Sequence, residues 1–395
     1  MLDLTLPMSD APLSFFALTA QYPDEASAER CFTAQRWPGG VKCPRCGSSN
    51  VQRGTQPGRN RQLWTCECRR QFSVTSGTVM ADTKIPLRKW LLAFHLMGAS
   101  KKGMSALQLR RMLAVTYQTA WHLCHRIRAT MTKNSQVFTG IVETDETYIG
   151  GVRRGRGKGY RANKAAVTTI IRRNTDGKQN SQAQTTAHPH EKIDGRTVGP
   201  ELRRHTIPGR TVLMTDDSPI YNRVGESFAD HHTVNHKSKE YVREDWDGHL
   251  ATTNTAEGYF ANLKRQIDGT HHHTSKKHLQ KYLEEHDFKY NSRGQLDGER
   301  TMAAIGNIEG RRLHLYKPAS GNGESLFDGK AGEARRKPKR AVKKRRNTKT
   351  ARLVTAAIGP RPLPPREAPK PLPPSLPASP VRPAQPAKPV KGGRK

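Results

Sequence analysis

The stretch "VFTGIVETDETYIGG", from Val137 to Gly151, predicts a β-strand that carries acids and ends at paired glycines. "KAAVTTIIRR" (164–173) predicts a second strand, and "AQTTAHPH" (183–190) predicts a weak third one. "GPELRRHT" (199–206) predicts a helix, and "RTVLMTDD" (210–217) a short apolar strand that ends in acids. Strands and helices in this order indicate an α/β sheet domain over residues 137–300.

The helix that follows, "NTAEGYFANLK" from Asn254 to Lys264, carries one acid in a strongly basic chain. Glu257 and Lys264 are two helical turns apart, so they lie nearly above one another, with Asn254 a turn below. A neighbouring apolar stripe consists of Tyr259, Phe260, Leu263 and Ile267. Taken alone, this pattern is also that of an ordinary amphipathic surface helix.

Acids from three separate segments are candidates for one metal site. Asp145 lies on the first strand, Asp216 at the end of a later strand and Glu257 on the helix. Three carboxylates on adjacent elements suit hard divalent cations, because Mg²⁺ takes oxygen ligands and keeps its other positions for water and phosphate. A basic chain attracts a polyanion such as DNA, but a pocket of three carboxylates would repel it. A bound metal ion would neutralise the pocket.

Three neighbouring acids compete for these roles. Glu143 is two residues before Asp145 on the same strand face and is a candidate partner outside the metal shell. Glu146 points the other way, and we expect it to be exposed. Asp217 adjoins Asp216 and is an alternative to it.

A second kind of metal site is predicted near the N-terminus. Residues 41–80 contain a CxxCG knuckle and, about twenty residues later, a CxC pair, which together supply Cys43, Cys46, Cys66 and Cys68. This pattern favours a zinc ribbon with four thiolate ligands, because the polar segment between the pairs is too small to fold without a metal. The CxC pair is one residue shorter than a usual knuckle, so a weakened site or a loop with incidental cysteines stays open.

Helical patterns surround the ribbon. Residues 1–40 form an N-terminal helical segment, and residues 84–133 contain "LRKWLLAFHLM", "SALQLRRML" and "YQTAWHLCHRIRATM". The last two, joined by "AVT", suit a helix-turn-helix with a small core of Leu107, Leu109, Leu113, Trp121 and Ile127. Its second helix would enter a DNA groove with His122, His125, Arg126 and Arg128. A plain three-helix packing unit is the alternative.

The charge points to a polyanionic partner. The formal net charge is +34 and the pI is about 10.4, a balance typical of proteins that bind nucleic acid. Residues 330–395 hold 20 Lys and Arg against Glu333 and Glu367, so this tail carries +18 and the rest +16. Thirteen of the 26 prolines lie from Pro360 onwards, without an aromatic residue, which predicts a disordered basic tail after a linker at 301–329.

Smaller basic segments have more than one interpretation. "RRKPKRAVKKRR" in the tail is a candidate phosphate-attracting arm or a solvated extension. "GGVRRGRGKGYRANK" (150–164) predicts an Arg-rich hairpin that grips phosphate beside the first aspartate. "HHHTSKKH" (His271–His278) favours contact with the DNA backbone over zinc, with a plain surface helix as the alternative.

No run of about 18 apolar residues occurs, so we expect no membrane partner and a cytoplasmic protein. Six cysteines, four of them in two close pairs, indicate metal ligation in a reducing compartment more than disulfides. Cys31 and Cys124 lie in helical segments and are predicted to be buried packing thiols.

Five blocks of the chain, taken in order, resemble the bacterial DDE insertion-sequence transposases with an N-terminal zinc ribbon, often called ISXO-like. The blocks are "VETDETYIGG", "TVLMTDD", "NTAEGYFANLK", "GTHHHTSKKHLQKYL" and "FKYNSR". "WPGGVKCPRCG" and "CRRQFSVTSGTVM" are similar to the ribbon of the same proteins. The resemblance covers residues 15 to 295 and leaves the tail unexplained.

The resemblance implies a ribonuclease H-like mixed sheet with flanking helices and two-metal phosphoryl transfer. It assigns Asp145, Asp216 and Glu257 as ligands of two Mg²⁺ or Mn²⁺ ions. Lys264 takes the family's position seven after the glutamate and would hold a phosphate of the transposon end. Some members have asparagine as the third site residue, which would match Asn254; Glu257 ranks first and Asn254 second.

The implied activity is cleavage and joining of DNA strands at the terminal inverted repeats of an insertion sequence. The implied partners are double-stranded DNA, as transposon ends and target, and further copies of the chain at synapsis, without a small-molecule cofactor. The implied location is the bacterial nucleoid. Two other functions stay open: a non-catalytic DNA-binding regulator with a decayed enzyme domain, and a nuclease that hydrolyses DNA without joining it.

Overall fold

The computed structural model describes residues 14–54, 61–132, 136–151, 164–175, 180–189, 193–235, 238, 240, 242–244, 250–316 and 324–327. The predicted basic tail and most of the predicted Arg-rich hairpin, residues 152–163, lie outside this part of the chain. Within it, no helix is long and apolar enough to cross a bilayer.

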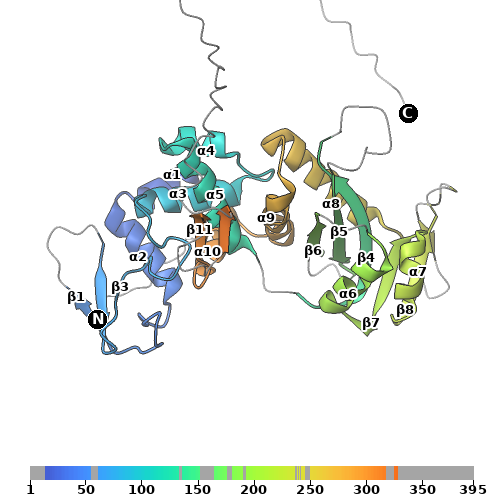
Figure 1. The fold of residues 1–395 in the computed structure, drawn as a ribbon, viewed down its shortest axis with the longest axis horizontal. Helices are drawn as coiled ribbons and strands as arrows, with labels where there is room; N and C mark the ends of the chain where they lie inside the picture. The colour runs from blue at the N-terminus through green and yellow to red at the C-terminus, as the bar shows by residue number, and fades with distance from the viewer. Residues whose placement is uncertain are drawn as a thin grey trace, which may run out of the picture. The chain divides into compact units, whose positions relative to one another are not determined.

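The N-terminal region begins with two helices, α1 (Phe15–Gln21) and α2 (Glu25–Arg36) (Figure 1). Both have capped N-termini, because Ser14 accepts from the Ala17 N–H, and Asp24 and Ser27 form a capping box. A three-stranded antiparallel sheet follows, made of β1 (Val51–Gly54), β2 (Leu63–Cys66) and β3 (Gln71–Phe72).

Three more helices continue this region: α3 (Leu87–Ala99), α4 (Ala106–Leu113) and α5 (Tyr117–Met131). The predicted link between α4 and α5 turns at Ala114, which has a left-handed backbone with φ 50°. Thr116 then caps α5 by accepting from the Thr119 N–H at 3.2 Å. Sequence patterns had indicated both helices, and the structure contains them.

A late helix, α10 (Asp297–Gly306), completes the N-terminal core. Ala304, Ile305 and Ile308 are fully buried in the same hydrophobic cluster as residues of α1, α2, α3 and α5. The structure therefore differs from the linker expected at 301–329, since residues 301–306 belong to a helix. The apolar side chains of this helix pack with those of helices near the N-terminus.

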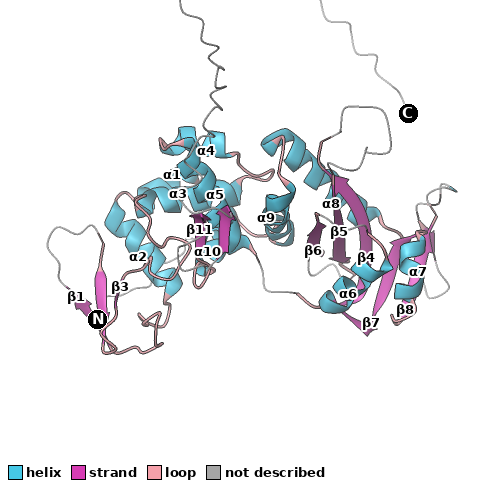
Figure 2. Cartoon of the chain, viewed as in Figure 1, coloured by secondary structure: helices cyan, strands magenta, loops and turns pink. Residues whose placement is uncertain are grey.

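The central sheet has five strands in the order β6-β5-β4-β7-β8 (Figure 2). β4 (Phe138–Ile149) and β5 (Ala165–Arg172) are antiparallel, as are β5 and β6 (Gln182–His188). On its other side β4 pairs parallel with β7 (Thr206–Asp216), which pairs parallel with β8 (Asp230–Val234). The predicted strands are present in a mixed sheet, and β8, whose "DHHTV" has no apolar run, was not predicted.

Helices cover both faces of this sheet. On one face, α6 (Gly195–His205) and α7 (Pro219–Gly225) form a core with even-numbered β4 residues such as Val142. On the other, α8 (Asn254–Gln266) and α9 (Leu279–Asn291) pack on odd-numbered ones such as Ile149. Because side chains alternate along a strand, Glu143 and Asp145 face α8, and Glu146 faces α7.

Short elements connect these parts. β9 (Arg243–Glu244) pairs with β10 (Leu250–Ala251) just before α8, and a π-helical turn, η2 (Ile267–His271), follows α8. A 3₁₀ turn, η3 (Lys276–His278), precedes α9. β11 (Leu313–Tyr316) pairs with β12 (Glu324–Phe327) beyond α10.

A buried ion cluster joins α5 to α9. Arg128 Nε lies 2.6 Å from Glu285 Oε2, and Lys289 Nζ lies 2.5 Å from Glu285 Oε1. Burial alone would raise the pKa of Glu285, but the charges of Lys289 and Arg128 hold that pKa well below its usual range. Glu285 is therefore ionised and pairs with both cations between the two helices.

Candidate catalytic site and metal-binding cysteines

Four cysteine sulfurs meet in the N-terminal sheet. The Sγ atoms of Cys43, Cys46, Cys66 and Cys68 lie within 4.8 Å of one another, with separations of 3.8 Å (Cys43 to Cys68) and 3.5 Å (Cys46 to Cys66). Four thiolates bound tetrahedrally to one zinc are about 3.8 Å apart. Burial opposes ionisation of Cys43, but the N–H groups of Arg45 and Cys46 help to lower its pKa to about 7. The arrangement fits structural Zn²⁺.

The shortened CxC pair closes this site through a tight turn. Cys66 ends β2 and its N–H donates to Arg70 O at 3.0 Å, while Arg69 N donates back to Cys66 O at 2.8 Å. Arg69 adopts a left-handed backbone with φ 62° to complete the turn. On the other side, Gly47 (φ 76°) donates its N–H to Cys43 O at 2.9 Å. The shorter spacing of the CxC pair therefore does not prevent its two sulfurs from meeting those of the CxxC pair.

The remaining two cysteines are packing residues. Cys31 is 5% exposed and Cys124 is fully buried, and both belong to the N-terminal hydrophobic core. Burial raises the pKa of each thiol to about 11, which disfavours the reactive thiolate. The prediction made for them is confirmed.

Asp145 and Asp216 lie level with one another on neighbouring strands. Asp145 is on the middle strand β4, opposite Thr169 of β5. The parallel register of β4 with β7 sets Glu143 opposite Met214, so two residues further on Asp145 comes level with Asp216, the last residue of β7. Both aspartates are half-buried.

Glu257 approaches from α8. The helix contacts β4 and β5, and it buries its predicted apolar stripe of Tyr259, Phe260 and Leu263 against them, with Ile267 in the next turn. Asn254 and Glu257 in the first turn and Lys264 in the last remain exposed along the helix. The stripe is confirmed, and the edge that carries Glu257 lies beside it on the exposed side of the helix.

The acids influence one another electrostatically. Burial raises the pKa of Asp145 to about 7. The Glu146 N–H, which donates to Asp145 Oδ1 at 2.7 Å, opposes this rise, whereas the charges of Glu146, Asp216 and Glu257 add to it. A nearby cation would favour the ionised carboxylate instead. The charges of Asp216 and Glu257 therefore both reach Asp145.

These carboxylates do not converge as tightly as the cysteines do. Among the residues that the structure describes, the cysteine sulfurs form the one group of three or more potential ligands close enough to share an ion. Mutual repulsion of three carboxylates opposes closer approach without a cation. The donor set, which consists of oxygens alone, fits Mg²⁺ or Mn²⁺ and does not favour zinc.

Glu143 has other partners than a metal. Its side chain is fully buried, and Arg173 Nε lies 2.7 Å from Glu143 Oε1. Glu143 Oε2 accepts a hydrogen bond from the Ala256 N–H of α8 at 2.9 Å. Arg173 and this backbone N–H were not singled out from the sequence, because they lie 30 and 113 residues from Glu143 and no local periodicity connects them.

The expectation that Glu146 is exposed was wrong. Its side chain is half-buried under α7, and the Tyr221 hydroxyl donates to Glu146 Oε2 at 2.6 Å. Burial raises the pKa of Glu146, the Tyr221 hydrogen bond lowers it and the charge of Asp216 raises it. Asp217, the other competitor, is exposed and accepts from Asn235 Nδ2 at 3.0 Å.

The residues predicted to enter a DNA groove are mostly unavailable for that role. His122 is half-buried, and His125, Arg126 and Arg128 are 0%, 7% and 1% exposed. Arg126 Nη2 donates to Ala81 O at 2.6 Å, and Arg128 pairs with Glu285. This assignment is corrected, because α9 covers His125 and Arg128 through Tyr282 and Glu285, and Arg126 packs against Trp90 of α3.

Other basic residues of the same region do face solvent. They are Lys101 and Lys102 before α4 and Arg110 and Arg111 in α4; the uncharged Tyr117 and Gln118 in the first turn of α5 are exposed as well. Of the predicted small core, Leu109, Leu113 and Ile127 are buried, Trp121 is half-buried and Leu107 is 47% exposed. The exposed side of α4 and the residues just before it therefore present positive charge, and the start of α5 presents uncharged polar side chains.

The histidine run does not form a metal site among the described residues. His272, His273 and Lys277 are exposed, whereas His271 is half-buried and burial lowers its pKa to about 4. Exposed histidine and lysine side chains can contact a DNA backbone.

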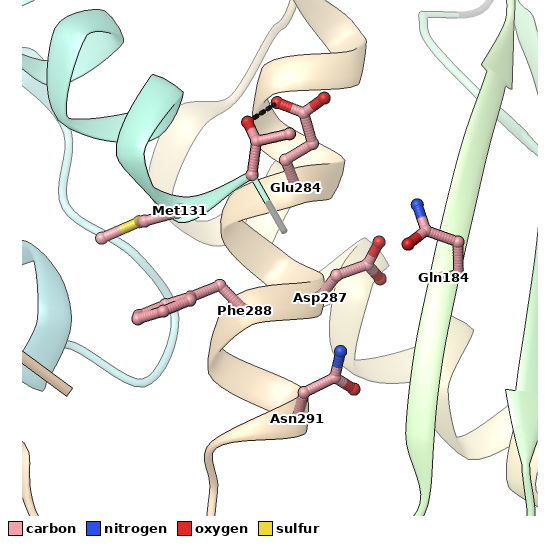
Figure 3. Close-up of a pocket in the computed structure, with 7 residues that line it drawn as sticks. Met131, Gln184, Glu284, Asp287, Phe288 and Asn291 are labelled. Carbon is pink, nitrogen blue, oxygen red and sulfur yellow. Dashed lines mark hydrogen bonds between the residues drawn. The ribbon is translucent and has the colours of Figure 1, made fainter. Parts of the chain in front are cut away.

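A small cavity lies between α9, β6 and the end of α5 (Figure 3). Met131, Gln184, Glu284 and Asn291 are among its lining residues, and Thr132 Oγ1 donates to Glu284 Oε2 at 2.7 Å. The cavity has room for about one water molecule.

Asp287, which also lines the cavity, joins α9 to the sheet. It accepts from the Thr185 N–H at 2.9 Å, from Thr185 Oγ1 at 2.8 Å and from the Tyr259 hydroxyl at 2.5 Å. Burial raises the pKa of Asp287 to about 7, while these hydrogen bonds lower it. The cavity is thus part of a structural contact and is too small for a substrate.

Comparisons with known proteins match the region of the central sheet and the region of the four cysteines to two separate families. The family described as "ISXO2-like transposase domain" matches residues 137–291. The family described as "Transposase zinc-ribbon domain" matches residues 23–71. An "Uncharacterized protein in transposable element ISH50" from Halobacterium salinarum is 26% identical over 284 residues, which cover 66% of this chain and 89% of that protein.

Proposed function

Because the chain belongs to the ISXO2-like transposases, with a zinc ribbon and a DDE transposase domain, we propose that it cleaves and joins DNA strands at the terminal inverted repeats of an insertion sequence. The mixed five-stranded sheet with helices on both faces supports a ribonuclease H-like domain for this reaction. Synapsis of two ends implies that more than one copy of the chain acts together.

The proposal depends on one arrangement: the register of β4 and β7 sets Asp145 level with Asp216, and α8, which carries Glu257, packs on β4 and β5. These three acids would hold two Mg²⁺ or Mn²⁺ ions. When bound, the ions activate a water or a 3′-hydroxyl and stabilise the leaving oxygen of the phosphodiester. The half-buried position of both aspartates limits competing water, which strengthens their hold on a cation.

Each residue of the chain has a separate task in this proposal. Asp145, on the middle strand, would contact both ions, and Asp216 and Glu257 would each complete a coordination shell. Lys264, exposed on the same edge of α8, would hold a phosphate of the transposon end. Asn254 remains the second candidate for the third position, since it lies in the same exposed first turn as Glu257.

We also propose that the exposed basic face of α4 and the start of α5 contacts the transposon ends, in place of the buried residues of α5. Lys101, Lys102, Arg110 and Arg111 supply charge for phosphates, and Gln118 offers a hydrogen-bonding side chain near the start of α5. The logarithm of the affinity for end DNA falls linearly with the logarithm of the salt concentration. Arg110→Ala and Arg111→Ala should each reduce the size of this slope by about 1. Arg204→Ala, an exposed residue of α6, is the matched control and should leave the slope unchanged.

Catalysis is tested with Asp145→Asn, Asp216→Asn and Glu257→Gln, assayed with Mn²⁺, labelled end DNA and a target plasmid. Each variant should lose strand transfer by at least about a thousandfold and still bind end DNA, because only the metal ligands change. Asp217→Asn is the control and should remain active. Retained activity in one variant removes that residue from the site.

The same assay separates the other functions. Wild-type protein that cuts DNA without joining it would be a nuclease. Wild-type protein that binds ends and neither nicks nor joins would be the non-catalytic regulator.

A further inference from the structure

Helix α8 receives its N-terminal cap from a distant strand. A helix leaves its first backbone N–H groups without partners inside the helix, and Thr253, the N-cap residue of α8, makes no side-chain capping hydrogen bond. Glu143 of β4 supplies the missing acceptor, since its Oε2 lies 2.9 Å from the Ala256 nitrogen. A carboxylate at this position is also stabilised by the helix dipole.

Arg173 ties the chain just before α8 to the same carboxylate. Its Nε donates to Glu143 Oε1 at 2.7 Å, its Nη1 to Leu250 O at 2.7 Å and its Nη2 to Thr252 O at 2.8 Å. The Arg173 N–H is itself held by Ile141 O of β4 at 2.9 Å. One guanidinium thus fixes β4, the end of β5 and the segment that enters α8.

This arrangement bears directly on the candidate metal ligands. Asp145 lies two residues beyond Glu143 on the same face of β4, about 6.6 Å along the strand. Glu257 is the residue after Ala256, whose N–H Glu143 holds. A slip of α8 by one residue would rotate Glu257 by about 100° around the helix axis.

We propose that Glu143 and Arg173 form a positioning clamp that holds the first turn of α8 against β4, so that Glu257 faces Asp145 and Asp216. The inference rests on the proposed function and adds how the third acid is held in place. Glu143 is placed in this proposal as a positioning residue that acts through α8, because its side chain is fully buried and its two oxygens accept from Arg173 and from the first turn of α8.

The clamp is tested by locating the metal relative to the backbone. Fe²⁺ occupies Mg²⁺ sites and, with ascorbate and peroxide, cuts the backbone beside its ligands; the fragments of the zinc-loaded full chain are then identified by mass. Wild-type protein should be cut near residues 145, 216 and 257. Glu143→Gln and Arg173→Ala should retain the first two cuts and lose the cut near 257 by about tenfold or more, the effect typical of residues that orient metal ligands.

Activity provides a second readout. Both variants should need about ten- to a hundredfold more Mn²⁺ for half-maximal strand transfer, with unchanged affinity for end DNA. Arg173→Lys keeps the positive charge but loses the planar guanidinium that donates to three acceptors. It should recover only part of the loss, because a lysine can reach only one of these acceptors at a time. Arg204→Ala again serves as the control.

The outcomes are distinct. If Glu143→Gln and Arg173→Ala are cut at the same places and to the same extent as the wild-type protein, the clamp is refuted and the proposed function stays in place. Equal loss of all three cuts in Glu143→Gln would make Glu143 a ligand and also overturn the clamp, as would a Glu143→Gln protein that no longer folds by circular dichroism. Wild-type protein without cuts near 145 and 216 would refute the proposed metal site, and the clamp with it.

Discussion

Replacing Asp145 by asparagine should stabilise the zinc-loaded protein when no Mg²⁺ or Mn²⁺ is present. The reason is that burial and the neighbouring acids raise the pKa of Asp145 from 3.8 to about 7. Above that pH the folded protein must keep a charge that its surroundings disfavour, whereas asparagine has the same shape and no charge.

The size of the effect follows from the two pKa values. Below pH 3.8 the carboxyl is protonated in both the folded and the unfolded state, so the charge has no cost. Between about pH 4 and pH 7 the unfolded chain gives up the proton and the folded one keeps it, so the free energy of unfolding falls by about 1.4 kcal/mol per pH unit. Above pH 7 the loss is constant at about 4 kcal/mol, and at pH 5 it is about 1.5 kcal/mol.

Urea denaturation followed by circular dichroism measures these differences, at pH 5 and pH 8 in metal-depleted buffer that leaves the ribbon zinc in place. Asp145→Asn should exceed wild type by about 4 kcal/mol at pH 8 and by about 1.5 kcal/mol at pH 5. Mn²⁺ at a hundred times its dissociation constant should stabilise wild type by about 2.7 kcal/mol and leave the variant unchanged. The neighbouring Asp217→Asn is the control, with a change within about 0.5 kcal/mol.

A wild-type protein as stable as Asp145→Asn at pH 8, or a difference that does not grow between pH 5 and pH 8, would refute this reasoning. Either result would mean that Asp145 is well solvated and distant from Asp216 and Glu257. Stabilisation of the variant by Mn²⁺ to the same extent as wild type would place the cation elsewhere.

Three further predictions concern the rest of the fold. Cys68→Ser should lower the bound zinc from one ion per chain to nearly none by atomic absorption, because the CxC pair closes the site; one zinc retained would exclude Cys68 as a ligand. Arg128→Met should reduce the free energy of unfolding in urea by about 3–5 kcal/mol, since it removes a partner of the buried Glu285, whereas the exposed ion pair of Arg204 should contribute less than about 1 kcal/mol. Gly103→Ala should cost about 1–3 kcal/mol by thermal denaturation, because a Cβ there would lie 3.0 Å from His271 Nε2 on a backbone with φ +78°, and a neutral result would show that this contact relaxes freely.

The sequence alone identified those features whose signal is local. A strand pattern that ends at glycines located β4, a short apolar run that ends in acids located β7, helical spacing located the buried stripe of α8, and the CxxC spacing located the ribbon. Such patterns can be recognised because each repeats within one or two turns of a helix or a few residues of a strand. The same segments contained Asp145, Asp216 and Glu257, so the candidate site could be proposed before any fold was known.

Contacts between distant segments could not be obtained in this way. The basic residues of α5 looked available for DNA until α9, more than 150 residues later, was seen to bury Arg128. Glu146 looked exposed until α7 was seen to cover it, and Arg173 carried no pattern that linked it to Glu143 or to the start of α8. The physical reason is that burial and hydrogen-bond partners depend on strand register and on which helix packs on which face, and these are properties of the whole chain that no short window of residues contains.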